Sequence, residues 1–76
     1  MKGVEKMINQ DNISFKLSLK AVRTNLDLNQ KEMAEKLDVS PCTWFNWEKG
    51  ITKMPAMKLK QLSIVSKIPE EYIFLP

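Results

Sequence analysis

The spacing of apolar residues along the chain predicts short helices. The first apolar stripe, at i, i+4, i+7 and i+11, consists of Phe15, Leu19, Val22 and Leu26. Such positions share one side of a helix, and Ser14 directly before them is a candidate N-cap. Residues 1–13 are polar without sustained periodicity, so we expect a flexible N-terminal arm there and a folded domain over residues 14–76.

A second helix is predicted by a capping motif followed by a short apolar stripe. Asn29 is followed three residues later by Glu32, the pattern of a capping box. The inward positions would be Met33, Ala34 and Leu37. Asp38 and Val39 then break the pattern, so this helix should be short.

The stretch "VSPCTWFNWEKG", residues 39–50, marks both ends of a third helix. Ser40 can cap the amides of the first turn, and Pro41 stands at the first helical position, where its missing N–H costs nothing. Gly50 is placed to take the left-handed conformation that commonly ends a helix. We therefore expect a helix over residues 41–49.

Pro55 and Pro69 mark the starts of two further predicted helices in residues 51–76. A fourth helix should begin with Pro55 in its first turn and run to about Ser66, and its inward residues would be Leu59, Leu62 and Val65. A last short helix should follow Pro69, with apolar residues Tyr72, Ile73 and Phe74. No β-pattern of useful length is present. The predicted fold class is all-α, a compact bundle of five short helices.

The third predicted helix has two different faces. At about 100° per residue, Trp44, Trp47 and Glu48 share one side, whereas Cys42, Asn46 and Lys49 point the opposite way. Paired tryptophans in so small a domain belong in the core, because the domain needs large buried areas. A carboxylate on the core side requires a partner, and Arg23, beside the first apolar stripe, is the candidate.

Length and composition limit the chain to one small globular domain. Of its 76 residues, 43% are apolar and 28% are charged, and no apolar run approaches the length of a membrane span. A single cysteine allows no internal disulfide, which fits a cytoplasmic protein. The net charge is +3, with the basic excess in residues 51–76. That excess suits a polyanionic partner, although a solvated lysine-rich face would look the same.

The sequence contains few residues of the types that carry out catalysis or bind metal ions. The chain has no histidine, no Cys/His cluster for zinc and no glycine-rich phosphate loop. Cys42 has no evident base beside it, so we expect no enzyme, no cofactor and no metal. A redox role for Cys42 at the start of a helix stays open as a lesser alternative.

The run "LKAVRTNLDLNQKEMAEKLDVSPCTWFNWEKG", residues 19–50, resembles the helix-turn-helix of the lambdoid phage repressor and Cro family, which also occurs in many bacterial regulators and antitoxins. The points of agreement are Leu19, Arg23, Gln30, Ala34, Val39, Ser40, Glu48 and Gly50. The resemblance continues more loosely through residues 51–74. It implies a lambda-repressor-like DNA-binding domain.

The resemblance also implies a set of site residues. Arg23 and Glu48 would form the family's structural ion pair, in agreement with the packing argument. The positions that would contact bases in the major groove are Pro41, Cys42, Thr43, Phe45 and Asn46. The positions that would contact phosphates are Asn29, Gln30, Lys49, Thr52 and Lys53.

The base-reading positions depart from the family pattern, which favours glutamine, arginine, serine or asparagine. Only Thr43 and Asn46 can hydrogen-bond well to a base edge. Asn46 could pair with adenine, and Phe45 or the Thr43 methyl could meet a thymine methyl. Part of the specificity would then come from DNA shape.

The resulting hypothesis is a cytoplasmic, Cro-sized transcriptional regulator or repressor that binds a double-stranded DNA operator as a homodimer. Phage, mobile-element and antitoxin contexts are equally compatible with it. The exposed apolar pair Cys42 and Phe45 suggests an alternative, a helix-turn-helix fold used as a protein-binding module such as an antirepressor or antitoxin. A second regulatory protein would then be the partner, and no membrane is involved in either case.

Overall fold

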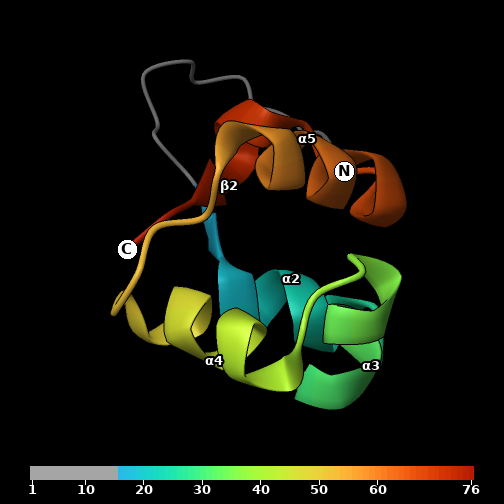
Figure 1. Cartoon of the computed structure of the whole chain (residues 1–76). Coiled ribbons are helices and arrows are strands. Elements are labelled where there is room, and N and C mark those ends of the chain that lie inside the picture. The colour runs from blue at the N-terminus through green and yellow to red at the C-terminus, as the bar shows by residue number, and fades with distance from the viewer. Residues whose placement is uncertain (1–15) are drawn as a thin grey trace, which may run out of the picture.

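The computed structural model describes residues 16–76 of the chain, most of which lie in four α-helices (Figure 1). The elements, in chain order, are β1 (Leu17–Ser18), α2 (Leu19–Asn25), α3 (Gln30–Lys36), α4 (Pro41–Lys49), α5 (Ala56–Ser66), the single 3-10 turn η1 (Glu70–Tyr72) and β2 (Ile73–Phe74). Helices α2, α3 and α4 lie together, and α5 lies on the other side of the molecule from α4 (Figure 1). The most extensive contact between two elements is that of α3 with α4.

Helix α2 begins later than its apolar stripe predicts. Its N-cap is Ser18, whose Oγ accepts a hydrogen bond from the Ala21 amide at 3.0 Å. Leu17 and Ser18 are extended because they pair with β2, so the helix cannot reach further toward the N-terminus. The predicted cap Ser14, together with Phe15 and the arm predicted over residues 1–13, lies outside the described residues.

The predicted signals at both ends of α3 and α4 are confirmed. Asn29 Oδ1 accepts from the Glu32 amide at 2.7 Å, and Glu32 Oε1 accepts from the Asn29 amide at 2.8 Å, which completes the capping box. Ser40 Oγ accepts from the Thr43 amide at 3.1 Å, with Pro41 as the first helical residue. Gly50 has φ +77° and ends α4. A Cβ on Gly50 would stand 3.2 Å from Pro76 Cβ, so both the backbone and the space at this position favour glycine.

Helix α5 and the segment after it differ from the prediction in two respects. Pro55 is the residue that precedes the helix and not part of its first turn, although the end at Ser66 is confirmed. The predicted fifth helix is wrong, because η1 supplies only one 3-10 turn and Ile73–Phe74 then pairs in parallel with Leu17–Ser18. Pairing with a strand 56 positions away, as counted from Leu17 to Ile73, is a tertiary contact that local pattern does not reveal.

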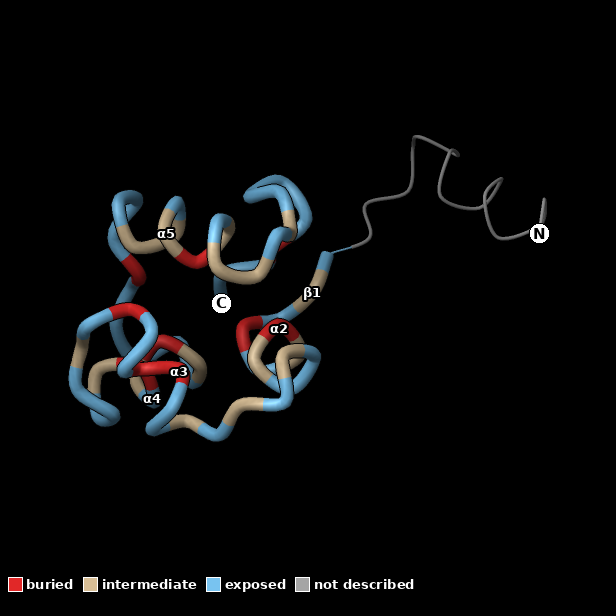
Figure 2. Tube along the Cα trace, turned by 90° about the vertical axis from the view of Figure 1, so that its right-hand side faces the viewer, coloured by how far each residue is buried: buried red, intermediate tan, exposed pale blue. Residues whose placement is uncertain are grey.

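The core consists of the apolar faces of all four described α-helices. Figure 2 shows the buried segments of the helices turned toward the interior of the molecule. The buried residues are Leu19, Val22, Met33, Ala34, Leu37, Trp44, Trp47, Met54, Leu62 and Ile73. The inward positions predicted for α3 and α4 are confirmed, and those predicted for α5 are either buried, as Leu62 is, or packed against the core, as Leu59 and Val65 are.

Polar side chains join α5 to its neighbours and close its C-terminal end. Lys58 Nζ donates to the carbonyl oxygen of Leu37 at 2.7 Å, which ties α5 to the end of α3. Ser63 Oγ donates to the Ile68 carbonyl at 2.6 Å, and Ser66 Oγ accepts from the Ile68 amide at 3.2 Å. These bonds give the half-buried Ser66 and Ser63 side chains hydrogen-bond partners at the end of α5. Within residues 16–76, no helix combines the length and the apolar character needed to cross a membrane.

The C-terminal end of α5 allows a test of backbone strain. Lys67 has φ +63°, a left-handed conformation that costs a residue with a Cβ about 1 kcal/mol and suits glycine. We expect Lys67→Gly to raise the free energy of unfolding by about 0.5–1 kcal/mol in urea titrations. The control is Lys60→Gly within α5, which should lower it by about 1 kcal/mol. A loss of stability in Lys67→Gly would contradict this account of the helix end.

Candidate nucleic-acid interface

Helix α4 is held to the rest of the domain by its two tryptophans. The Trp44 side chain is fully buried and Trp47 is 5% exposed. Their ring centroids are 6.1 Å apart at an interplanar angle of 75°, an edge-to-face arrangement that favours aromatic packing. The predicted inward face of α4 is therefore confirmed, and its opposite face lies at the surface of the molecule.

Glu48 occupies the polar centre of this packed face. Its side chain is 6% exposed and that of Arg23 is 11% exposed, and the two form the predicted ion pair through Arg23 Nε. Arg23 Nη2 lies 3.4 Å from Glu48 Oε1, and Gln30 Nε2 donates to the same oxygen at 3.1 Å. The indole N–H of Trp44 donates to Glu48 Oε2. We call Arg23, Gln30, Trp44 and Glu48 the carboxylate cluster.

The carboxylate cluster stabilises the charged form of Glu48. Burial by itself raises the pKa of the Glu48 carboxyl. Hydrogen bonds from Arg23, Gln30 and Trp44, together with the positive charge of Arg23, outweigh that effect and hold the pKa below its ordinary value of 4.5. Glu48 is therefore ionised at neutral pH and acts as a permanent acceptor for groups on α2, α3 and α4.

Arg23 has a second structural contact. Its Nη1 donates to the Leu28 carbonyl at 3.0 Å. The same guanidinium thus fixes the chain between α2 and α3 and the orientation of α4. The Arg23–Glu48 pair was predicted from the sequence, but Gln30 and Trp44 as further donors to Glu48, and the Leu28 carbonyl as a second acceptor from Arg23, were not.

The outward face of α4 is apolar at its start and positive at its end. Pro41, Cys42, Phe45 and Lys49 are exposed there, and Thr43 and Asn46 are half-buried. Glu48 is the only acidic residue of α4, and it points inward, so this face carries no negative charge from its own helix. Lys49 Nζ lies 5.6 Å from the Phe45 ring centroid, a cation–π distance.

The hydrogen-bonding side chains on this face differ in whether they already have a hydrogen-bond partner within the protein. Ser40 Oγ and Thr43 Oγ1 are 2.9 Å apart and share a hydrogen bond. Asn46 Nδ2 makes only a weak contact of 3.9 Å with Cys42 Sγ in the described structure. The Asn46 amide is consequently the group on α4 best able to exchange its present contact for one with a partner.

The residues predicted to contact phosphates divide into two groups. Asn29 and Gln30 have structural roles already, because the side-chain oxygen of Asn29 caps α3 and the amide of Gln30 donates to Glu48. A glutamine amide carries two N–H groups, so Gln30 can still offer the second one. The other three, Lys49, Thr52 and Lys53, are exposed at the end of α4 and in the loop that follows. That loop is anchored by the Ile51 amide, which donates to the Asn46 carbonyl at 2.9 Å.

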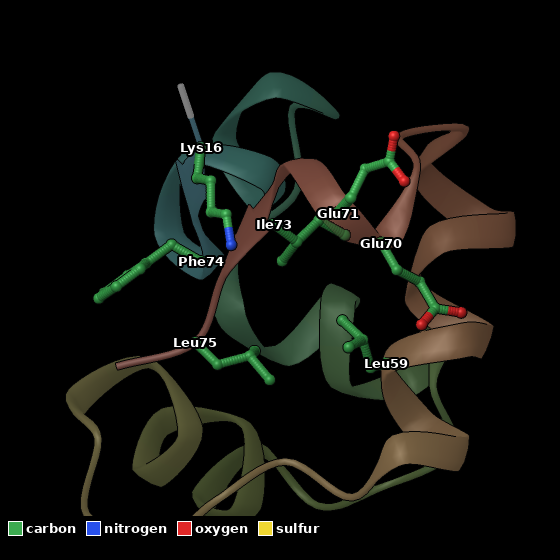
Figure 3. Close-up of a pocket in the computed structure, with 7 residues that line it drawn as sticks. All are labelled: Lys16, Leu59, Glu70, Glu71, Ile73, Phe74 and Leu75. Carbon is green, nitrogen blue, oxygen red and sulfur yellow. The ribbon is translucent and has the colours of Figure 1, made fainter. Parts of the chain in front are cut away.

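A second surface feature lies at the C-terminal end of the chain and was not predicted as a depression. It is lined by Lys16, Leu59, Glu70, Glu71, Ile73, Phe74 and Leu75. Figure 3 shows Leu59 and Leu75 facing each other across it, with Lys16 beside Phe74. Its mixture of one lysine, two carboxylates and apolar side chains presents no constellation typical of catalysis. Among residues 16–76 no group of three or more metal-ligating side chains gathers in one place.

Comparison with known proteins identifies one short similarity. No protein-family model matches the chain, and no solved structure matches it. A segment of 36 residues is 50% identical to the type II methyltransferase M.MspI of Moraxella sp. The matched segment is 47% of this chain and 9% of that protein, so the chain spans less than a tenth of its relative's length. The similarity is therefore confined to a short segment of both proteins.

The carboxylate cluster predicts a specific pH dependence of stability. The folded state lowers the pKa of Glu48, so it binds fewer protons than the unfolded state near that pKa. The stabilisation is complete above the unfolded value of 4.5 and is lost as the pH falls through the lower folded value. Glu48→Gln should therefore be less stable by about 3 kcal/mol at pH 7. The difference from the unmodified protein should narrow below pH 4.5.

The measurement is chemical denaturation at pH values between neutrality and acid. The matched control is Glu35→Gln, which removes an exposed carboxylate on α3. That variant should stay within about 0.5 kcal/mol of the unmodified protein at neutral pH. A difference for Glu48→Gln that stays constant from pH 7 into acid would show that the Glu48 charge does not contribute to folding.

Proposed function

We propose that this protein is a sequence-specific DNA-binding transcriptional regulator whose helix α4 enters the major groove. The observation that carries the proposal is the two-sided construction of α4. One side is anchored by Trp44, Trp47 and Glu48, and the other side is exposed, free of acidic residues and ends in Lys49. A rigid helix with such an outward face can be inserted between two strands of phosphates without electrostatic repulsion.

The arrangement of α3 and α4 supports a helix-turn-helix interpretation. Residues 37–40 connect the two helices, and Val39 packs against the core from within this connection. In helix-turn-helix proteins the second helix lies in the groove while the first crosses the backbone. Under this proposal α3 would face the sugar-phosphate backbone, and Lys49, Thr52 and Lys53 would contact phosphates beyond the other end of α4.

We propose a binding module and not an enzyme. The 36-residue similarity to a type II methyltransferase covers 9% of that protein, too small a part to carry methyl transfer to this chain. The described surface offers, at Cys42, an exposed thiol without an activating base. Binding through α4 requires neither a cofactor nor a metal ion.

A homodimer is the proposed binding form, because one such module reads only a short stretch of DNA. The C-terminal end provides apolar surface for a second copy. Ile73 is buried within the domain, whereas Phe74 and Leu75 remain exposed at the depression in Figure 3, and Tyr72 is also exposed. The alternative, a protein-binding module such as an antirepressor or antitoxin, would use the exposed Phe45 and Cys42 against a partner protein.

The test of the proposed function is selection from a pool of randomised duplexes at two salt concentrations, followed by sequencing of the retained DNA. We expect a palindromic or pseudopalindromic sequence with half-sites about one helical turn apart, and binding that weakens steeply with salt. A single, non-repeated site would contradict the dimer. Weak binding at both salt concentrations with no enriched sequence would contradict DNA recognition and favour a protein partner for α4.

Two substitutions separate phosphate contacts from base contacts. Lys53→Ala should weaken binding to specific and random duplexes alike and lower the salt slope by about one unit. Asn46→Ala should cost about 1–3 kcal/mol on the selected site only. Lys60→Ala is the matched control, since it removes an exposed lysine from α5, away from α4 (Figure 1). Equal losses for Asn46→Ala on both kinds of duplex would refute its role in base reading.

A further inference from the structure

The Phe45 side chain is the most prominent apolar group on the outward face of α4. It is 39% exposed, although an aromatic ring of this size is usually placed in the core of a small domain. Pro41 lies one turn before it and Lys49 one turn after it, on the same stripe of the helix. Lys49 Nζ at 5.6 Å from the ring centroid occupies one side of the ring. The Phe45 ring is therefore partly covered by the Lys49 side chain and partly exposed to water.

The groups around Phe45 offer few hydrogen bonds to a base edge. Pro41 and Cys42 contribute apolar surface, and the Thr43 hydroxyl is already shared with Ser40 at 2.9 Å. The Asn46 amide is the strong donor and acceptor that remains on this face, with its weak contact of 3.9 Å to Cys42. A helix with this surface distinguishes bases by apolar contact at most positions and by hydrogen bonding at one.

In the major groove, the apolar feature that differs between base pairs is the C5-methyl group of thymine. Cytosine lacks this group unless it is methylated. The other major-groove features are donors and acceptors, which Phe45 cannot satisfy and would leave without partners. An exposed aromatic ring on the recognition helix therefore matches a methyl-bearing pyrimidine better than any other base.

We propose that Phe45 selects a C5-methylated pyrimidine, thymine or 5-methylcytosine, in the DNA site bound by α4. This inference rests on the proposed function and adds to it the chemical class of base that the helix reads. The adjacent Asn46 amide then recognises the neighbouring base, and adenine is the best match for its paired donor and acceptor. Lys49 places its charge at the edge of this contact, where the phosphate backbone lies.

The test uses the duplex retained in the selection, with each thymine of a half-site replaced in turn by deoxyuridine. This change removes one methyl group and leaves the base-pairing groups intact. We expect at least one position at which the dissociation constant rises about fourfold, the effect of losing one buried methyl. At that position a 5-methylcytosine·guanine pair should bind more tightly than an unmethylated cytosine·guanine pair by a similar factor.

Variants of Phe45 assign the effect to this side chain. Phe45→Ala should bind the thymine and deoxyuridine duplexes equally, whereas Phe45→Leu, which keeps an apolar side chain, should retain part of the discrimination. Lys60→Ala on α5 should discriminate as the unmodified protein does. Because Phe45 faces outward, thermal unfolding of both variants should match that of the unmodified protein. If Phe45→Ala is less stable, the reduced discrimination expected of Phe45→Leu carries the comparison, and full discrimination in Phe45→Leu then contradicts the role of Phe45.

The outcomes separate this inference from the function on which it rests. Failure to enrich any duplex overturns both. An enriched site that binds thymine and deoxyuridine duplexes equally at every position overturns methyl recognition and leaves DNA binding intact. Two further outcomes overturn the role given to Phe45. One is an enriched half-site that has no thymine on either strand and binds no more tightly when its cytosines are 5-methylated, and the other is discrimination that persists in Phe45→Ala.

Discussion

The structure depends on one buried carboxylate. Glu48 accepts hydrogen bonds from Arg23 on α2, Gln30 on α3 and Trp44 on its own helix. A buried charge without partners would cost several kcal/mol, so the arrangement of the three helices that brings these donors together is favoured over one that separates them. The carboxylate cluster therefore does more than add stability, because it fixes the direction in which α4 is presented.

This anchoring determines the character of the surface that α4 offers. The side chains of Trp44, Trp47 and Glu48, the single acidic residue of α4, are packed in the interior. The exposed residues of the helix are Pro41, Cys42, Phe45 and, at its end, Lys49. Such a surface is poor in hydrogen bonds, and this is the reason that the proposed recognition relies on apolar contact at Phe45 and on one amide at Asn46.

The C-terminal segment completes the domain by a different means. Ile73 inserts into the core while its backbone pairs with Leu17, so the two ends of the described chain are joined beside each other. Lys58 links α5 to the end of α3 through the Leu37 carbonyl. This lysine belongs to the basic excess that the charge distribution suggested for a polyanion, yet its ammonium group is used within the fold.

The sequence by itself determined the features that depend on neighbours within a few positions. The caps at Asn29, Ser40 and Gly50, the extent of α4 and the inward positions of α3, α4 and α5 all follow from local hydrogen bonding and helical periodicity. The Arg23–Glu48 pair was also predictable, because a carboxylate on a core face demands a cation. Only the tertiary structure decided the rest. It ended the predicted fifth helix after one turn and paired Ile73–Phe74 with β1, and it brought Gln30 of α3 to Glu48 of α4. Such contacts join segments whose separation along the chain no local pattern encodes.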